Sequence, residues 1–258
     1  MKAHTKKALA FALAAVLALG LMLSGCGGDA GSTTPQTGGS GSGETPATLT
    51  DGDLGLITQG KLTVGSDCDY PPLIYLEGDK PLGFEFELLD AIATDLGLTL
   101  EFLPPQNFDT LVTQVQGGGK MDLAVSSLTI TDDRLKSIDF CTPYFDSNQA
   151  VVTLTSSALT SSADLAGKTI GAQSGTTGEM WSNENIPGAT VKSYNQASEG
   201  LAALQAGDIE ALIFDEPVAF YQVNKTYTDC QIVEVIPTGE QYGFAVSKEN
   251  PALKEAVN

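Results

Sequence analysis

The stretch "FEFELLDAIATDLGLTLEFLPPQNFDTLVTQVQGGGKMDLAVSS", residues 84–127, carries the pattern that decides the fold. Its first part, residues 84–97, places apolar side chains at helical spacing and stops at Gly97. Residues 108–119 repeat the helical pattern directly after Asn107, a residue type that caps helices. The stretch therefore predicts two helices.

Short runs of β-forming residues lie before, between and after these helices. They cover residues 61–67, 98–103 and 121–127. A strand, helix, strand, helix, strand order is typical of an α/β domain with a mostly parallel sheet covered by helices on its faces.

The alternation starts again in the second half of the chain. An extended run at 148–154 precedes "DLAGKTIGAQSGTTGEMW" (164–181) and "SEGLAALQAGDIEALIFDEPVAFYQV" (198–223), which read as strand, helix, helix, strand and helix. Two such halves predict two lobes with a cleft between them, and the cleft is the default ligand site. We expect lobe 1 at 51–148, lobe 2 at 149–238 and a return to lobe 1 at 239–258.

The N-terminal residues are typical of a secretory leader rather than of a domain. Three lysines precede an apolar run that ends in "LSGC" (23–26), which resembles the bacterial lipobox. This predicts a lipoprotein signal peptide over 1–25 and lipidation of Cys26; the alternative is a signal peptide that happens to contain a cysteine. Residues 26–50, rich in Gly, Ser and Thr, read as a flexible linker. The pattern predicts a protein anchored by lipid at the cell membrane, on its extracellular or periplasmic face.

Composition excludes several functions. The formal charge of −19 argues against nucleic acid as a partner, because phosphate binding needs clustered basic residues. The only histidine, His4, lies in the predicted leader, so the mature chain has no Ser-His-Asp triad and no His metal ligand. We expect neither a metal nor a cofactor.

Cys68, Cys141 and Cys230 match no zinc spacing and read as small buried apolar residues.

Two loops at expected strand ends carry unusual residues. In "SDCDYPP" (66–72), Asp67 and Tyr70 offer a carboxylate and an aromatic face, although a proline-stiffened turn explains the loop equally well. In "SSLTITDDR" (126–134), hydroxyl side chains precede the only arginine of the chain. Arg134 can bind a carboxylate through two parallel hydrogen bonds. Alternatively, it is exposed to solvent beside a helix cap formed by Thr131 or Asp132.

Two further segments complete the candidate site. "AQSGTTGE" (172–179), with Thr176 and Thr177, leads a glycine turn into a helix N-terminus, which suits a small anion. Asp215 ends a buried strand in "IFDEP" and either accepts from an ammonium or caps the helix after Pro217. Together, a cationic and an anionic pole describe a site for an α-amino acid, since buried charges are tolerated when paired.

These segments resemble the family 3 extracellular solute-binding proteins, the amino-acid receptors of ABC importers. The resembling stretches include "LTVGSDCDYPPL", "MDLAVSSLTITDDR", "DLAGKTIGAQSGTT" and "AGDIEALIFDEPVA", and the resemblance covers the chain from about Lys61 onward. It implies a type II periplasmic-binding-protein fold, with two α/β lobes, a ligand cleft and two hinge crossings. It also implies an L-amino acid as ligand and an ABC permease and ATPase as partners.

The resemblance also implies roles for single residues. Arg134 would hold the α-carboxylate, helped by Thr129 and Thr177, and Ser127 and Asp215 would accept from the α-ammonium. Tyr70 and Phe108 would enclose the ligand side chain. Asp67 would reach a polar or cationic tip, and Gln173 stands where the family varies with specificity. The implied ligand is a polar or basic amino acid: Arg, Lys or His, or Gln.

Two alternative functions stay open from sequence. The same fold contains enzymes of the cyclohexadienyl dehydratase type, and it also serves as an amino-acid sensor module. Family members usually continue for some two dozen residues past "KEAVN", so we expect a truncated C-terminus.

Overall fold

The computed structural model describes residues 54–258. The predicted leader (1–25), the lipidation site Cys26 and the linker (26–50) lie outside the described residues. Within residues 54–258, no helix combines the length and the apolar character that a membrane span requires.

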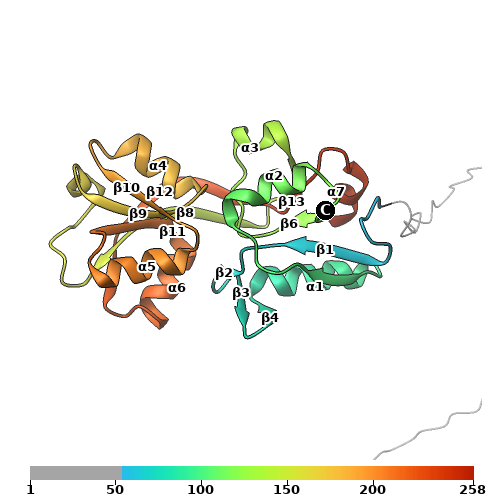
Figure 1. Ribbon diagram of the computed structural model, residues 1–258, viewed down its shortest axis with the longest axis horizontal. Coiled ribbons are helices and arrows are strands. Elements are labelled where there is room, and N and C mark those ends of the chain that lie inside the picture. Colours follow the sequence, from blue (N-terminus) through green and yellow to red (C-terminus); the bar gives the residue numbers. More distant parts are fainter. Residues whose placement is uncertain (1–53) are drawn as a thin grey trace, which may run out of the picture. The chain divides into compact units, whose positions relative to one another are not determined.

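Lobe 1 is built on a five-stranded sheet in the order β5-β1-β6-β13-β7 (Figure 1). Strands β1, β5 and β6 are parallel, and β13 runs antiparallel to β6 and β7. A small antiparallel sheet, β2-β3-β4, follows β1. The elements are β1 (Lys61–Gly65), β2 (Asp69–Tyr70), β3 (Ile74–Glu77), β4 (Lys80–Leu82), α1 (Phe84–Asp95), β5 (Thr99–Phe102), a 3₁₀ turn (Phe108–Thr110), α2 (Leu111–Gln116), β6 (Leu123–Ala124), α3 (Asp132–Ser137), β7 (Asp139–Phe140), β13 (Ala245–Val246) and α7 (Pro251–Val257).

Lobe 2 is built on a second five-stranded sheet in the order β10-β9-β11-β8-β12. Strands β9, β10 and β11 are parallel, whereas β8 runs antiparallel to β11 and β12. The elements are β8 (Phe145–Leu154), a 3₁₀ turn (Ser162–Leu165), β9 (Thr169–Gln173), α4 (Thr177–Asn185), β10 (Thr190–Tyr194), α5 (Ala197–Ala206), β11 (Ala211–Asp215), α6 (Glu216–Lys225) and β12 (Cys230–Tyr242).

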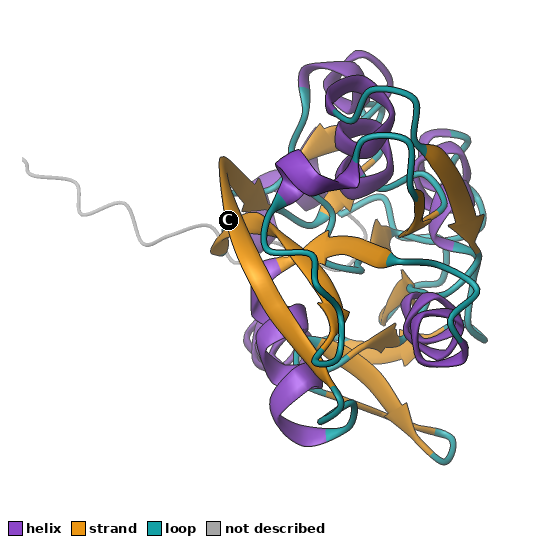
Figure 2. Ribbon diagram, turned by 90° about the vertical axis from the view of Figure 1, so that its left-hand side faces the viewer, coloured by secondary structure: helices purple, strands orange, loops and turns teal. Residues whose placement is uncertain are grey.

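Helices cover both faces of the lobe 1 sheet: in Figure 1, α1 lies below β1 and α2 above it, and Figure 2 shows helices above and below strands in the turned view. Neighbouring residues of β6 point to opposite faces, so Leu123 joins one apolar cluster and Ala124 another. The first cluster contains Leu89 of α1, and the second contains Leu111 of α2. Burying each such leucine contributes about 1.5–3 kcal/mol. The predicted α/β architecture is confirmed.

The antiparallel pair β8 and β12 links the two lobes. Its register runs from Cys230 opposite Leu154 to Tyr242 opposite Phe145, with irregularities on the way. At the lobe 1 end, Tyr242 also pairs with Thr129. Residues of β8 and β12 therefore touch both lobes, and they flank the region where ligand binding was expected.

Some predicted details differ. The helix expected at 108–119 begins as a 3₁₀ turn and becomes α-helical at Leu111. Asn107 makes no capping hydrogen bond through its side chain. The three cysteines in the described part of the chain are buried, free thiols, which confirms their reading as small apolar residues.

Candidate functional site

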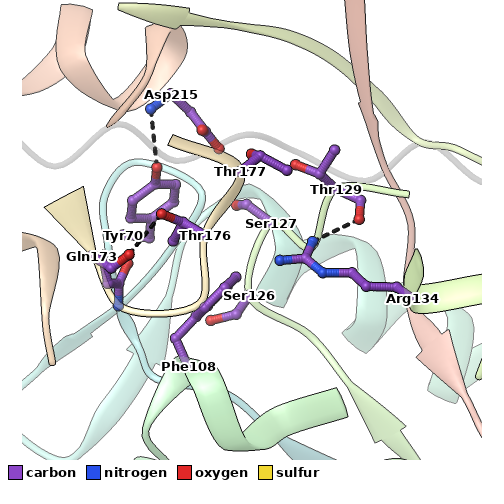
Figure 3. Close-up of a pocket in the computed structure, with 10 residues that line it drawn as sticks. All are labelled: Tyr70, Phe108, Ser126, Ser127, Thr129, Arg134, Gln173, Thr176, Thr177 and Asp215. Carbon is purple, nitrogen blue, oxygen red and sulfur yellow. Dashed lines mark hydrogen bonds between the residues drawn. The ribbon is translucent and has the colours of Figure 1, made fainter. Parts of the chain in front are cut away.

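The predicted site segments come together at the carboxyl ends of parallel strands. They follow β1, β6, β9 and β11, as expected for open α/β sheets. Their side chains surround one pocket, shown in Figure 3, whose lining is Tyr70, Phe108, Ser126, Ser127, Thr129, Arg134, Gln173, Thr176, Thr177 and Asp215. Nine of the ten predicted binding residues line it, and Ser126 is an addition that the sequence reasoning did not name as a ligand contact.

Arg134 is the cationic group of the pocket. It lies on α3, whose first turn is capped by the Thr131 hydroxyl, which accepts from the backbone N–H of Arg134 at 3.2 Å. The side chain is 8% exposed. The helix cap by Thr131 is thus confirmed, but Arg134 is buried in the pocket and not in solvent. The contact between Arg134 and a carboxylate stays a prediction.

The guanidinium of Arg134 is held by neutral groups. Its Nη1 donates to the carbonyl of Thr129 at 2.6 Å and its Nη2 to the carbonyl of Gly175 at 3.0 Å. Its central carbon lies 5.6 Å from the ring centroid of Phe108, within cation–π range. Burial lowers the pKa of Arg134 from its ordinary value, while the charges of Asp215 and Glu240 oppose that shift.

Arg134 forms no ion pair within residues 54–258, where every ion pair involves a lysine. A buried cation without a paired anion is costly, because burial removes its hydration. The arrangement is therefore suited to an anion brought into the pocket from outside.

Asp215 is the acidic group of the pocket. It ends β11 and is 6% exposed. Its carboxylate accepts from Gln149 Nε2 at 2.5 Å and from the hydroxyl of Tyr242. Although Asp215 stands at the N-cap position of α6, its side chain makes no capping hydrogen bond. Burial, and secondly the charge of Glu240, raises the pKa of Asp215 to about 7.

Ser127 has a backbone conformation that is rare for residues with a side chain, with φ at 49°. Glu85 of α1 stabilises it, because one carboxylate oxygen accepts from both the backbone N–H (2.9 Å) and the hydroxyl (2.7 Å) of Ser127. Tyr144 donates to the same oxygen at 2.7 Å. Glu85 is fully buried, and burial raises its pKa to about 7.

Asp67 does not line the pocket. It is buried behind Ser126 and Gln173, accepting from the hydroxyl of Ser126 and from Gln173 Nε2, the latter at 2.8 Å. The bond from Gln173 joins the two lobes, since β1 precedes Asp67 and β9 ends at Gln173. Contact between Asp67 and a ligand stays a prediction.

Glu240 is a polar group near the pocket that the sequence reasoning missed. It lies in β12 and accepts from the hydroxyls of Thr129 and Thr177, each at 2.7 Å, and from Gln149 Nε2 at 2.9 Å. Its segment, residues 238–243, carried no motif beyond a strand pattern, so only the tertiary structure reveals this position.

The described part of the chain contains no group of three or more His, Cys, Asp or Glu side chains that could hold a metal ion. The polar groups of the pocket are one guanidinium, one carboxylate, hydroxyls and an amide. This set can bind a small zwitterion through ion pairs and hydrogen bonds.

Two known binding proteins are similar to this chain over most of its length. The L-cystine-binding protein TcyJ of Escherichia coli (strain K12) is 32% identical over 213 residues, which cover 80% of this chain and 79% of that protein. The arginine-binding extracellular protein ArtP of Bacillus subtilis is 31% identical over 208 residues, covering 76% of this chain and 80% of that protein.

Solved structures are also similar. The arginine-bound form of truncated ArgBP from T. maritima has a TM-score of 0.74 and 32% identity, covering 78% of this chain and 95% of that one. AncCDT-1, an ancestral amino-acid-binding protein described as a precursor of cyclohexadienyl dehydratase, has a TM-score of 0.71 and 32% identity, covering 77% of this chain and 87% of that one. The profile of bacterial extracellular solute-binding proteins, family 3, matches residues 62–258, and the chain belongs to this family.

Proposed function

We propose that this protein is the substrate-binding component of an ABC importer and that it captures a polar or basic L-amino acid. The observation that carries the proposal is Arg134, a buried guanidinium that lines the pocket and has no ion pair within residues 54–258. An α-carboxylate would supply the missing charge, and the α-ammonium would face Asp215.

The other pocket residues then have defined roles. Tyr70 and Phe108 would contact the ligand side chain, and Ser127 would accept from the ammonium. Gln173, with Asp67 behind it, would meet the tip of the ligand side chain. Relatives that are named for binding arginine and cystine support a polar ligand of this kind.

The predicted N-terminal segment indicates where in the cell the protein would act. A lipid on Cys26 and the linker after it would hold the binding domain at the outer face of the cell membrane, close to a permease and its ATPase. The ligand would bind between lobe 1 (51–148 and 239–258) and lobe 2 (149–238), and the two crossings would act as the hinge.

A dehydratase is the second candidate, because AncCDT-1 is described as a precursor of such an enzyme. The relatives named above are binding proteins, which favours a binding function here. Incubation with prephenate separates the two functions: we expect no product, and turnover would establish the enzyme.

A thermal-shift screen of the purified protein against the twenty amino acids tests the proposal, because a ligand of the folded state raises the melting temperature. We expect a polar or basic L-amino acid to give the largest shift. The complete absence of a shift, followed by no heat of binding in calorimetry, would contradict the proposed function.

Arg134→Lys then tests the carboxylate contact. Lysine keeps the charge but loses the planar fork, so we expect binding to weaken at least about a hundredfold. Lys136→Ala is the control, since Lys136 lies on the same helix but is exposed and pairs with Asp133. Native affinity in Arg134→Lys would place the carboxylate elsewhere.

A further inference from the structure

Glu240 contacts the pocket residues without lining the pocket itself. One carboxylate oxygen, Oε2, lies 2.7 Å from the hydroxyl of Thr129 and 2.7 Å from the hydroxyl of Thr177. The other oxygen accepts from Gln149 Nε2 and from the hydroxyl of Thr238, each at 2.9 Å. Thr129 belongs to lobe 1 and Thr177 begins α4 of lobe 2, so one carboxylate oxygen is bonded to both lobes.

These contacts fix the direction of two hydroxyl protons. An ionised carboxylate only accepts, and a threonine hydroxyl has a single proton to donate. Thr129 and Thr177 therefore donate that proton to Glu240, and only lone pairs remain for a ligand. Gln149 Nε2 also lies 3.2 Å from the hydroxyl oxygen of Thr177, farther than from Asp215 (2.5 Å) and Glu240 (2.9 Å), which take its two protons.

We propose that Glu240 is a positioning residue of the ligand site, which takes the hydroxyl protons of Thr129 and Thr177 so that both oxygens serve the ammonium end of the ligand. This inference rests on the proposed function and reassigns the two hydroxyls. The resemblance had placed them with Arg134 at the α-carboxylate, for which they would need the protons that Glu240 holds.

The electrostatics of the pocket agree with this assignment. Gln149 donates to both Asp215 and Glu240, so the two carboxylates are neighbours on the same side of the site. The charge of Glu240 adds to burial in raising the pKa of Asp215, whereas Tyr70 and Tyr242 lower it by hydrogen bonding. The charge of Asp215 in turn raises the pKa of Arg134, against the effect of burial.

The substitution Glu240→Gln tests the role. Glutamine has nearly the same shape, but its NH₂ group cannot accept a hydroxyl proton. With L-arginine as the probe and L-glutamine as the second, we expect binding at pH 7 to weaken about tenfold, the effect of one charge-assisted hydrogen bond. The control is Glu234→Gln on the same strand, whose carboxylate accepts from the backbone N–H of Ser162.

A pH series separates positioning from a structural effect. In Glu240→Gln, Asp215 loses a neighbouring charge, so the pH below which affinity falls should move to lower values than in the wild-type protein. A parallel loss at every pH would mean that Glu240 only supports the fold, and tighter binding would mean that Glu240 competes with the ligand carboxylate. Either result overturns the proposal.

A double-mutant cycle tests the contact without any ligand. Melting temperatures of Glu240→Gln, Thr129→Val and the double variant should be non-additive, because both changes remove one hydrogen bond. Additive changes would overturn the proposal even if amino acids bind. If the wild-type protein binds no amino acid, the proposed function fails. In that case a non-additive cycle still supports the proposed orientation of the two hydroxyl groups. An additive cycle overturns that orientation.

Discussion

The ionisation of Asp215 links ligand affinity to pH. Its pKa is raised to about 7 by burial, so below pH 7 the empty pocket holds a protonated carboxyl. The ligand ammonium binds the ionised carboxylate of Asp215, so a protonated carboxyl must release its proton when the ligand binds. We predict that affinity is highest near pH 8, where Asp215 is ionised and the ligand ammonium keeps its proton, and that it falls as pH decreases, approaching tenfold per pH unit well below the pKa of Asp215.

Calorimetry in two buffers with different ionisation heats checks this prediction by counting the protons released on binding at pH 6. Glu85, whose pKa is also raised to about 7, contacts the pocket through Ser127, so a control is needed. In Asp215→Asn, proton release should vanish and affinity should become weaker. Proton release that persists in this variant would assign the effect to another group.

Single residues show what sequence could and could not predict. Arg134 stood out as the only arginine of the chain, and its loop was found because strand ends are predictable from the α/β pattern. Glu240 could not be found in this way. It reaches Thr129 and Thr177 because β12 is irregular between Ile236 and Glu240, and such an irregularity depends on strand pairing rather than on local sequence.

At the scale of elements, periodic segments were predicted well and short ones were not. The helix expected at 84–97 is α1, Phe84–Asp95. The strand expected at 121–127 is reduced to Leu123–Ala124, where its pairing with β1 and β13 ends, and Ser127 beyond it adopts a positive φ. The three short strands β2, β3 and β4 had no periodic signal, since they contain only two, four and three residues.

The cap of helix α3 offers a prediction at this scale. The Thr131 hydroxyl accepts from the backbone N–H of Arg134, so it fixes the turn that carries the guanidinium. We predict that Thr131→Ala lowers the free energy of unfolding by about 1 kcal/mol. It should also weaken amino-acid binding several-fold, and Thr131→Ser should restore both; urea unfolding and calorimetry measure the two effects.

Asn250→Ala provides the matched control. Asn250 caps α7 by accepting from the backbone N–H of Leu253 at 3.1 Å, and it does not line the pocket. Its loss should cost a similar free energy without changing affinity. Equal affinities in the two alanine variants would show that the α3 cap has no part in positioning Arg134.

At the scale of the whole described domain, direct hydrogen bonds close the pocket between the lobes. Arg134 donates to the carbonyl of Gly175, Gln173 donates to Asp67, and the backbone N–H of Ser198 donates to Asp69 at 2.9 Å. The sequence predicted two lobes and a cleft but gave no information on these contacts, because each joins residues far apart in the chain. The lobe boundaries at 148 and 238 stay predictions.

Gly175 is the position where closure can be tested by one substitution. Its φ is +76°, and a Cβ added there would lie 2.9 Å from the Cα of Asp109 in the opposite lobe. Gly207 has a similar φ of +78°, but nothing lies within 4 Å of its added Cβ. Alanine at either position costs about 1–2 kcal/mol in backbone strain, whereas only Gly175→Ala also pushes the lobes apart.

We therefore predict that the two variants lose similar free energies of unfolding but differ in binding. Gly175→Ala should weaken amino-acid binding, since an open pocket leaves the ligand charges partly in water, and Gly207→Ala should bind like the wild-type protein. Small-angle X-ray scattering with saturating ligand should give a larger radius of gyration for Gly175→Ala than for Gly207→Ala. Equal radii and equal affinities would mean that the ligand is held without contact between Gly175 and Asp109, and hence that binding does not require the closed arrangement.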